Sequence, residues 1–189
     1  MSNQWNPAFA FTAAVGLTAV AASAATPPSS SPAPAQSASP ALIRPAGPSS
    51  KAQIEALEAR FAAAFDAKDV ARIMSVYARD GLFVFDVTPP RQHVGWEDYK
   101  KDWEGFLGSI PGPVTLEISD LDVTVIGPVG YSHSIQDARW TAAGGATSEV
   151  TVRVTDVYRK IAGKWRIVQE HVSVPVDLDT GKADLLSKP

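Results

Sequence analysis

Apolar residues recur at helical spacing in the part of the chain that follows residue 49. A first helix is predicted to begin at Ser50, where Ser50 and Gln53 form a capping box that satisfies free N–H groups of the first turn. Its apolar residues lie three or four positions apart and therefore share one face of a helix: Ile54, Leu57, Phe61 and Phe65. This face is expected to pack against a core.

Two further helices are predicted after the first. Asp69 caps the second, and Gly81 is expected to end it in a left-handed conformation. Its buried side comprises Val70, Ile73, Met74 and Tyr77. The third helix precedes Pro111 and carries an apolar and aromatic stripe at Trp96, Tyr99, Trp103, Phe106, Leu107 and Ile110. The charged residues from Glu97 to Asp102 are expected to face outward.

The remaining sequence shows strand patterns. A short run from Leu82 to Val87 ends at Pro89-Pro90, and residues 91–95 are expected to return beside it. Four longer strands follow, separated by glycine-containing turns: Val114 to Ile126, Tyr131 to Ala142, Glu149 to Arg159 and Lys164 to Val174. This order predicts an α+β fold, with three N-terminal helices packed on a curved antiparallel sheet of about five to six strands.

The central strands carry apolar residues on both of their faces. The second face of the sheet is therefore expected to be covered, and no further helix is left to cover it. We expect a homodimer formed through the outer sheet face. In the tail after residue 179, Leu185 and Leu186 are candidates for docking on the partner subunit.

The final hairpin carries the main candidate site. A three-residue loop at residues 161–163 places Arg153 roughly opposite His171 with both side chains on one face, whereas a loop one residue shorter separates them. A guanidinium beside an imidazole on a largely apolar sheet calls for an anion, so we interpret this face as the floor of a pocket. The alternative is that Arg153 forms an ion pair with Glu170 or Asp156 and that His171 is a hydrogen-bonded sheet residue.

Residues 1–25 are predicted to form a signal peptide. An Ala-rich apolar run ends in Ala22-Ser23-Ala24, which favours cleavage after Ala24 and a periplasmic or secreted protein. The first residues contain no Lys or Arg, so an uncleaved membrane anchor and a misassigned start codon are the alternatives. Residues 26–49 are rich in Pro, Ser and Ala and are expected to form a disordered linker. The folded domain is assigned to residues 50–179 and a tail to residues 180–189.

Composition excludes several kinds of chemistry. The chain has no cysteine, which excludes disulfides, thiolate catalysis and cysteine-ligated zinc. Its net charge of −3 at pH 7 gives no reason to expect nucleic acid as a partner. Apart from the N-terminal run, no membrane association is expected.

A set of short motifs carries a family resemblance. The second helix ends in Tyr-Ala-Arg-Asp-Gly, Phe-Val-Phe-Asp follows it, and the third helix begins with Gly-Trp-x-x-Tyr. The last hairpin adds Arg153-x-Thr155, Gly163-Lys164-Trp165 and His171-x-Ser173-x-Pro175. Together they resemble the SnoaL-like proteins of the ketosteroid isomerase and nuclear transport factor 2-like superfamily, from Ser50 to about Asp179.

The resemblance implies a cone-shaped, cystatin-like roll with an apolar cavity. It implies little about activity, because this fold hosts isomerases, cyclases, hydrolases, dehydratases and non-catalytic modules. In the similar proteins, the positions of Arg153 and His171 face the cavity. His133 matches a pocket arginine of the kinase II association domain, although the serines on either side of it indicate an open strand face. The inward positions of the first helix are apolar, so the tyrosine of the steroid isomerase site has no counterpart there.

Asp86 and the aromatic residues complete the candidate site. Asp86 lies at the rim of the expected cavity, where desolvation makes a carboxylate a usable general base; the alternative is an aspartate that forms the turn before Pro89. Trp96, Tyr99 and Trp103 are expected in the core, which in a cone also forms the cavity wall. A phenol from Tyr99 or Tyr77 can reach a ligand oxygen.

No metal and no cofactor are expected. Asp86, His93, His133 and His171 have no pair with the close helical spacing of a zinc motif. Arg153 beside His171 would also repel a cation.

The sequence therefore predicts a cavity that binds a small organic molecule bearing a carboxylate or carbonyl group. Acid–base chemistry of the isomerase, cyclase or dehydratase kind would use Asp86, His171 or His133. Ligand contacts would come from Arg153, Tyr99, Trp103, Trp96 and Tyr77. A non-catalytic ligand-binding module and an oligomerisation module are the alternatives.

Overall fold

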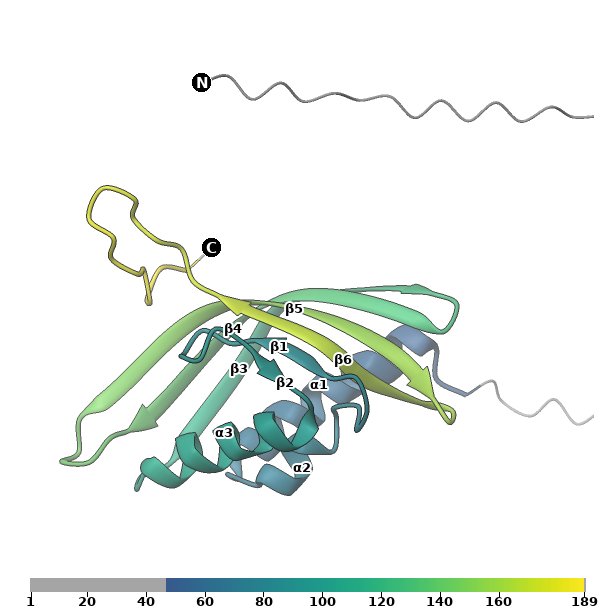
Figure 1. The fold of residues 1–189 in the computed structure, drawn as a ribbon, viewed down its shortest axis with the longest axis horizontal. Helices are drawn as coiled ribbons and strands as arrows, with labels where there is room; N and C mark the ends of the chain where they lie inside the picture. The colour runs from purple at the N-terminus through teal and green to yellow at the C-terminus, as the bar shows by residue number, and fades with distance from the viewer. Residues whose placement is uncertain (1–46, 189) are drawn as a thin grey trace, which may run out of the picture. The chain divides into compact units, whose positions relative to one another are not determined.

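The structure is a computed structural model that describes residues 47–188. The predicted signal peptide and nearly all of the predicted linker lie outside the described residues, so export stays a prediction. Within the described part, no helix has the length and apolar character needed to cross a bilayer. The elements along the chain are α1 (Ser50–Asp66), α2 (Val70–Met74), β1 (Phe83–Phe85), β2 (His93–Val94), α3 (Trp96–Ser109), β3 (Val114–Ile126), β4 (Val129–Thr141), β5 (Thr147–Ile161) and β6 (Lys164–Ser173), as Figure 1 shows.

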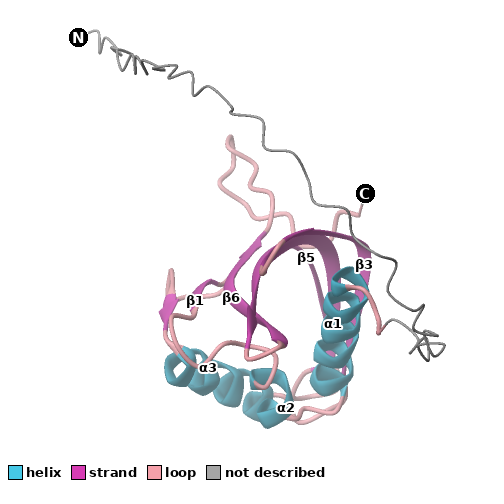
Figure 2. Ribbon diagram, turned by 90° about the vertical axis from the view of Figure 1, so that its right-hand side faces the viewer, coloured by secondary structure: helices cyan, strands magenta, loops and turns pink. Residues whose placement is uncertain are grey.

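The six strands form one curved sheet in the order β2-β1-β6-β5-β4-β3. The helices lie on its concave side, with α1 running along β3 and α3 below β1 and β2 (Figure 2). The predicted α+β roll with three helices is confirmed. The sheet is not wholly antiparallel, however, because β1 and β6 pair in parallel.

The helix boundaries differ from the sequence-based expectation at two places. The N-cap of α1 is Ser49 rather than Ser50, and its hydroxyl oxygen accepts a hydrogen bond from the N–H of Ala52. Helix α2 is capped by Asp69 as predicted, but it ends at Met74, well before Gly81. It ends there because residues 76–78 leave the helix and exchange backbone hydrogen bonds with Ile167 of β6.

The core lies between α1, α3 and the concave face of the sheet. The four apolar residues predicted on the first helix are all buried in it. The sheet supplies Val84, Val114, Val123, Ala138, Tyr158, Trp165 and Ile167. Burial of this apolar surface fixes the helices against the sheet and so sets the position of the site.

The β5–β6 hairpin has a register that sequence alternation does not reveal. Its turn is the two-residue Ala162-Gly163, both with positive φ as a type I′ turn requires, so the predicted three-residue loop is wrong. Farther along, Tyr158 pairs with Ile167 and Val157 with Gln169, which leaves Val168 as a bulge without a partner. This bulge reverses which residues of β6 face the core.

The convex face of the sheet and the tail after β6 are the parts of the described chain that bear on the predicted homodimer. The tail after β6 makes a projecting loop (Figure 1) and then returns to its own chain, where the Thr151 N–H donates to the Leu185 carbonyl at 2.7 Å. Lys188 forms an ion pair with Asp137 at 3.3 Å. Leu185 therefore contacts its own β5, Leu186 is exposed, and the homodimer through the outer face stays a prediction.

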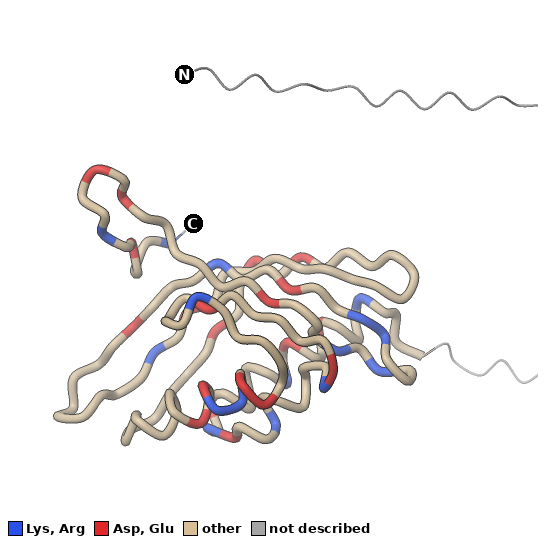
Figure 3. The backbone as a smooth tube through the Cα atoms, viewed as in Figure 1, with Lys and Arg blue, Asp and Glu red and all other residues tan. Residues whose placement is uncertain are grey.

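Charged positions are mixed in sign along the third helix. Figure 3 shows acidic and basic positions interspersed on α3 rather than gathered by sign. Most of these side chains face outward as expected, but Lys101 and Asp102 line the interior cavity. Asp102, which lies one turn after Tyr99, is the one that matters for the site.

Candidate functional site

A cavity of about 870 Å³ lies between the concave face of the sheet and the helices. This volume is in the range of small-molecule binding sites, which span roughly 300–1,000 Å³. Its wall is mainly apolar and aromatic, formed by Phe61, Phe65, Trp103, Phe106, Leu116, Ala138, Trp140, Val150, Val152, Val154 and Val172. Residues of all the longer elements contribute to this lining.

Aromatic rings make one wall of the cavity continuous. Trp103 meets the ring of Phe61 edge to face at 5.9 Å and that of Phe106 at 6.1 Å, and Phe106 meets Trp140 at 5.8 Å. Such offset contacts are favourable and limit ring motion. The buried indole N–H of Trp103 has no acceptor among the described residues. Tyr99 and Trp103 thus line the cavity as the sequence predicted.

Glu170 forms the polar base of the cavity. It extends from β6 into the interior and is only 4% exposed. The Tyr99 hydroxyl donates to Glu170 Oε1 at 2.7 Å, and the Tyr77 hydroxyl donates to Oε2 at 2.8 Å. Two phenols on different elements therefore fix the orientation of one carboxyl group.

A second buried acid, Asp156, lies directly opposite Glu170 on the neighbouring strand. Asp156 is 1% exposed, and its Oδ1 receives no N–H or O–H donor from the described residues. Burial, followed by the charge of Glu170, raises the pKa of Asp156 well above its usual range.

The network continues from Asp156 to the first helix. The hydroxyl of Tyr158 donates to Glu58 Oε1 at 2.7 Å, and it lies 2.7 Å from Ser132 Oγ and 3.5 Å from Asp156 Oδ2. Glu58 is 2% exposed. Among the described residues, none of the ion pairs connects Glu58, Asp156 or Glu170 to a basic side chain.

Burial without a counter-charge changes how these acids titrate. Desolvation raises the pKa of Glu170 to about 7, against the opposing effect of the hydrogen bonds from Tyr99 and Tyr77. Desolvation likewise raises the pKa of Glu58 to about 7, opposed by the hydrogen bond from Tyr158. Burial also raises the pKa values of Tyr77 and Tyr99, so both phenols remain donors at neutral pH.

Asp86 takes both of the roles considered for it from sequence. Its Oδ1 accepts the backbone N–H of Thr88 at 3.2 Å, which stabilises the turn after β1. Its Oδ2 lies 3.3 Å from the Tyr99 hydroxyl, and the residue lines the cavity. Asp86 and Glu170 thus contact the same phenol from two sides.

The structure contradicts the predicted pocket positions of Arg153, His171 and His133. All three are exposed on the convex face, opposite the cavity, although Arg153 and His171 do share a face as predicted. His171 is opposite Thr155 and lies beside the ring of Phe85 at 5.5 Å, over a shallow surface depression. The bulge at Val168 is the reason, because it turns Glu170 inward and His171 outward.

His133 has the opposite orientation from its neighbours. The serines on either side of it are buried, so the strand face that they share is the interior one and His133 faces solvent. The predicted match to a pocket arginine is therefore wrong. Among residues 47–188, the cavity lining includes none of Arg153, His133 and His171.

Tyr77 and Trp96 lie behind the cavity wall rather than in it. Tyr77 reaches the cavity only through its hydrogen bond to Glu170. Trp96 donates from its indole N–H to the Met74 carbonyl at 2.9 Å, and the guanidinium of Arg79 lies 3.5 Å from the centre of its ring. Trp96 thus connects α3 to α2, and its predicted contact with a ligand is wrong.

The sequence analysis did not identify the three buried acids as site residues, although two of them left a signal. Glu58 lies four residues after Ile54 and three before Phe61, on the apolar stripe of α1. Asp156 lies between Val154 and Tyr158 and, like them, occupies a position of β5 that faces the interior. Glu170 gave no such signal, because its inward orientation depends on the bulge.

Comparison with solved structures shows where this fold recurs. A nuclear transport factor 2-like protein of unknown function from Pseudomonas putida KT2440 shares 29% identity, with a TM-score of 0.67 over 74% of this chain and 96% of that one. A predicted scytalone dehydratase from Novosphingobium aromaticivorans DSM 12444 shares 15% identity, with a TM-score of 0.60 over 66% and 83% of the two chains.

A third similar structure is a ketosteroid isomerase-like protein from Erwinia carotovora atroseptica SCRI1043, with 21% identity and a TM-score of 0.56 over 65% of this chain and 94% of that one. No functionally curated protein matches the chain in sequence. The profile of the SnoaL-like domain matches residues 54–177, which include every element from most of α1 to β6. The chain therefore belongs to the SnoaL-like domain family of the nuclear transport factor 2-like superfamily.

Proposed function

We propose that this domain is an enzyme that moves a proton on a small, neutral, largely apolar molecule held in the cavity, and that Glu170 is the proton-transfer group. The observation that carries the proposal is a single carboxyl group with a pKa of about 7 at the base of an apolar cavity. A group of this kind is present in both protonation states at neutral pH, as a general acid or base requires.

The charges of the cavity wall indicate the class of ligand. One wall residue is basic, Lys101, whereas four are acidic: Asp86, Asp102, Glu149 and Glu170. A carboxylate ligand would meet net repulsion, because the guanidinium that was expected to bind it lies on the other face. The electrostatics therefore favour a neutral ligand with a carbonyl or hydroxyl group over the carboxylate alternative.

The surroundings of Glu170 suit it to take a proton from carbon. In its ionised form it is held by hydrogen bonds from the hydroxyl groups of Tyr77 and Tyr99. Glu170 is only 4% exposed, so its carboxylate competes with little solvent. Proton removal next to a carbonyl group begins both isomerisation and many dehydrations, the two reactions named in the similar structures.

A probe reaction tests Glu170 without knowledge of the natural substrate. Nitrobenzisoxazole opens to a coloured phenol when a base removes its ring C–H proton, and it is small, apolar and neutral. We expect saturable turnover by the chelator-treated protein that rises with pH, with a midpoint near the pKa of Glu170, about 7. The Glu170→Gln variant should lose about 100-fold or more of the rate, the usual size of a general-base contribution.

The matched control is Glu117→Gln, which removes an exposed carboxylate of β3 and should leave the rate unchanged. Near-ultraviolet circular dichroism establishes that both variants are folded. Equal rates in Glu170→Gln and the parent protein would overturn the assignment. Quenching of tryptophan fluorescence by the probe without any turnover would identify a binding protein instead.

A further inference from the structure

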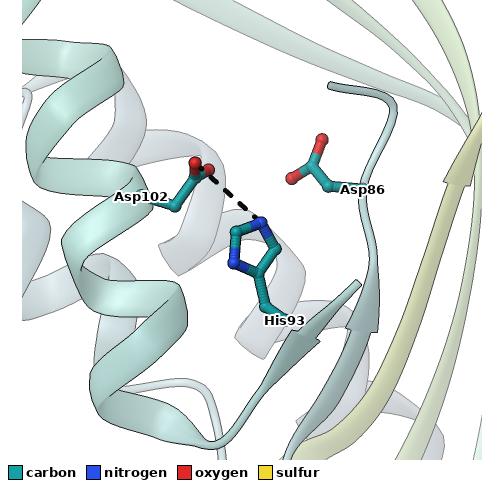
Figure 4. Close-up of side chains that lie close together, drawn as sticks. All are labelled: Asp86, His93 and Asp102. Atoms are coloured by element: carbon teal, nitrogen blue, oxygen red, sulfur yellow. Dashed lines mark ion pairs between the residues drawn. The ribbon is translucent and has the colours of Figure 1, made fainter. Parts of the chain in front are cut away.

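Three side chains converge on one point at the cavity rim, beside the Glu170 network. Asp86 follows β1, His93 belongs to β2 and Asp102 lies on α3. One potential ligand atom from each lies within 4.8 Å of the others. Figure 4 shows the His93 ring between the two carboxylates, with Asp86 and Asp102 turned toward the same space.

His93 is the unusual member of this group. Its side chain is 3% exposed, and both ring nitrogens are buried without a hydrogen-bond partner in the described residues. Nε2 lies 3.9 Å from Asp102 Oδ1, and Nδ1 lies 3.4 Å from Asp98 Oδ2, both too long for good hydrogen bonds. A buried imidazole left in this state is costly unless something binds it.

The carboxylates around His93 also lack a counter-charge. In the part of the chain that the structure describes, no ion pair joins Asp86, Asp98 or Asp102 to a lysine or arginine. A cation at this point would therefore balance the charge of the two partly buried carboxylates and use the free imidazole nitrogen.

We propose that Asp86, His93 and Asp102 bind one divalent transition-metal ion, with Asp98 as an outer carboxylate that orients the imidazole. One imidazole nitrogen and two carboxylate oxygens are ligands that suit Zn²⁺, Mn²⁺, Fe²⁺ and Co²⁺. Nδ1 faces Asp98, which leaves Nε2 for the ion, the usual arrangement of a carboxylate–histidine–metal unit. Metal–ligand distances of about 2.0–2.2 Å require the two carboxylates to move inward by roughly 1 Å.

The site has room for a ligand beside the ion. Asp86 and Asp102 both line the cavity, so coordination positions not filled by protein face the space where a small molecule would bind. An ion there polarises a carbonyl or hydroxyl oxygen of that molecule. The proposed site stands on its own geometry and does not rest on proton transfer by Glu170.

Cobalt is the probe that tests this proposal. Full-length protein without an affinity tag is treated with chelator, dialysed and titrated with Co²⁺ alone, and visible absorption and calorimetry follow binding. We expect one equivalent to bind with d–d absorption bands and to be displaced by Zn²⁺. His93→Gln and Asp102→Asn should weaken binding at least tenfold, since each removes a ligand, and Asp98→Asn should weaken it about 10- to 100-fold.

Two controls keep the result specific. His133→Gln removes an exposed imidazole and Asp80→Asn an exposed carboxylate, and neither should change binding. If His93→Gln fails to fold, Asp102→Asn alone decides, because its side chain is less buried. Absence of stoichiometric binding, or binding that survives both ligand substitutions, would overturn the proposal. The readout is binding, so failure of the Glu170 rate test leaves it standing, and the converse holds.

Discussion

Asp156 and Glu170 occupy directly opposed positions on β5 and β6, both are buried, and the charge of Glu170 adds to desolvation in raising the pKa of Asp156. A negative charge on either carboxyl group disfavours ionisation of the other in a desolvated site. The pair therefore connects the stability of the fold to pH, and it also fixes the protonation state from which Glu170 would act.

Stability should fall as pH rises from mildly acid to mildly alkaline values. The pKa values of Glu58 and Glu170 rise from 4.5 to about 7 on folding, so the folded state binds their protons more tightly. Their contribution is fully present below pH 4.5 and is lost as pH passes 7, up to about 3 kcal/mol for each group. Urea unfolding at pH 5 and pH 8 measures this difference.

One other carboxylate does not affect this prediction, and a double variant tests it. The Thr180 backbone N–H lowers the pKa of Asp177, so this residue titrates below pH 3.8 and leaves the interval unaffected. A Glu58→Gln, Glu170→Gln double variant should show a flatter pH dependence. A parent protein more stable at pH 8 than at pH 5 would contradict the protonation states assigned to the buried acids.

Asp156→Asn should stabilise the protein at pH 8 and leave it unchanged at pH 4. Because burial raises the pKa of Asp156, the folded protein binds a proton there at a cost that grows with pH, whereas an asparagine is neutral at both pH values. We expect a gain of about 1–2 kcal/mol at pH 8, within the usual range for one substitution. Chemical unfolding at both pH values tests it, and a loss at pH 8 would show that Asp156 is ionised.

Tyr99→Phe should shift the pH profile of the probe reaction toward higher pH. The substitution removes a hydrogen bond to the ionised form of Glu170, which raises the pKa of that carboxyl further. Such a bond to a charged group contributes about 1.5–3 kcal/mol. Tyr131→Phe is the control, because Tyr131 is exposed on the outer face. An unshifted profile would mean that the group titrating in the rate is not Glu170.

Two glycines offer a matched pair for the packing of the fold. A Cβ at Gly112 would lie 2.6 Å from Thr141 Cβ and 2.9 Å from its carbonyl oxygen, so Gly112→Ala should destabilise by about 1–3 kcal/mol. A Cβ at Gly105 within α3 meets nothing within 4 Å, so Gly105→Ala should stabilise by about 0.5–1 kcal/mol. Thermal unfolding of both variants checks the opposite signs.

The fold followed from local patterns, because each helix and strand has its own periodicity. The stripe from Ile54 to Phe65 and the strand from Val114 to Ile126 both appear in the structure. Boundaries that depend on long-range pairing were less accurate. Helix α2 ends early because the chain after Met74 joins β6, and nothing near Met74 in sequence signals that contact.

The site was less accessible to sequence analysis than the fold. Tyr99 and Trp103 could be placed at the cavity because they belong to the aromatic stripe of the third helix, and Asp86 because it follows a clear apolar run. The residues of the cavity floor were predicted from the alternation of inward and outward positions along β6. An extra residue in the strand reverses that alternation. Asp102 was hidden in a run of charged residues, where composition indicates solvent and only the helical spacing from Tyr99 indicates the interior.

The bulge at Val168 gives β6 one residue that has no partner on β5. A chain that lacked Val168 could pair Ile167 and Gln169 with the same partners as now, so a shorter strand would still present a carboxylate to the cavity. If the bulge lay beyond His171 instead, the strand would turn the imidazole of His171 toward the cavity without any change of residue. Which side chain the floor of the cavity presents therefore depends on where one strand is irregular as well as on its residues.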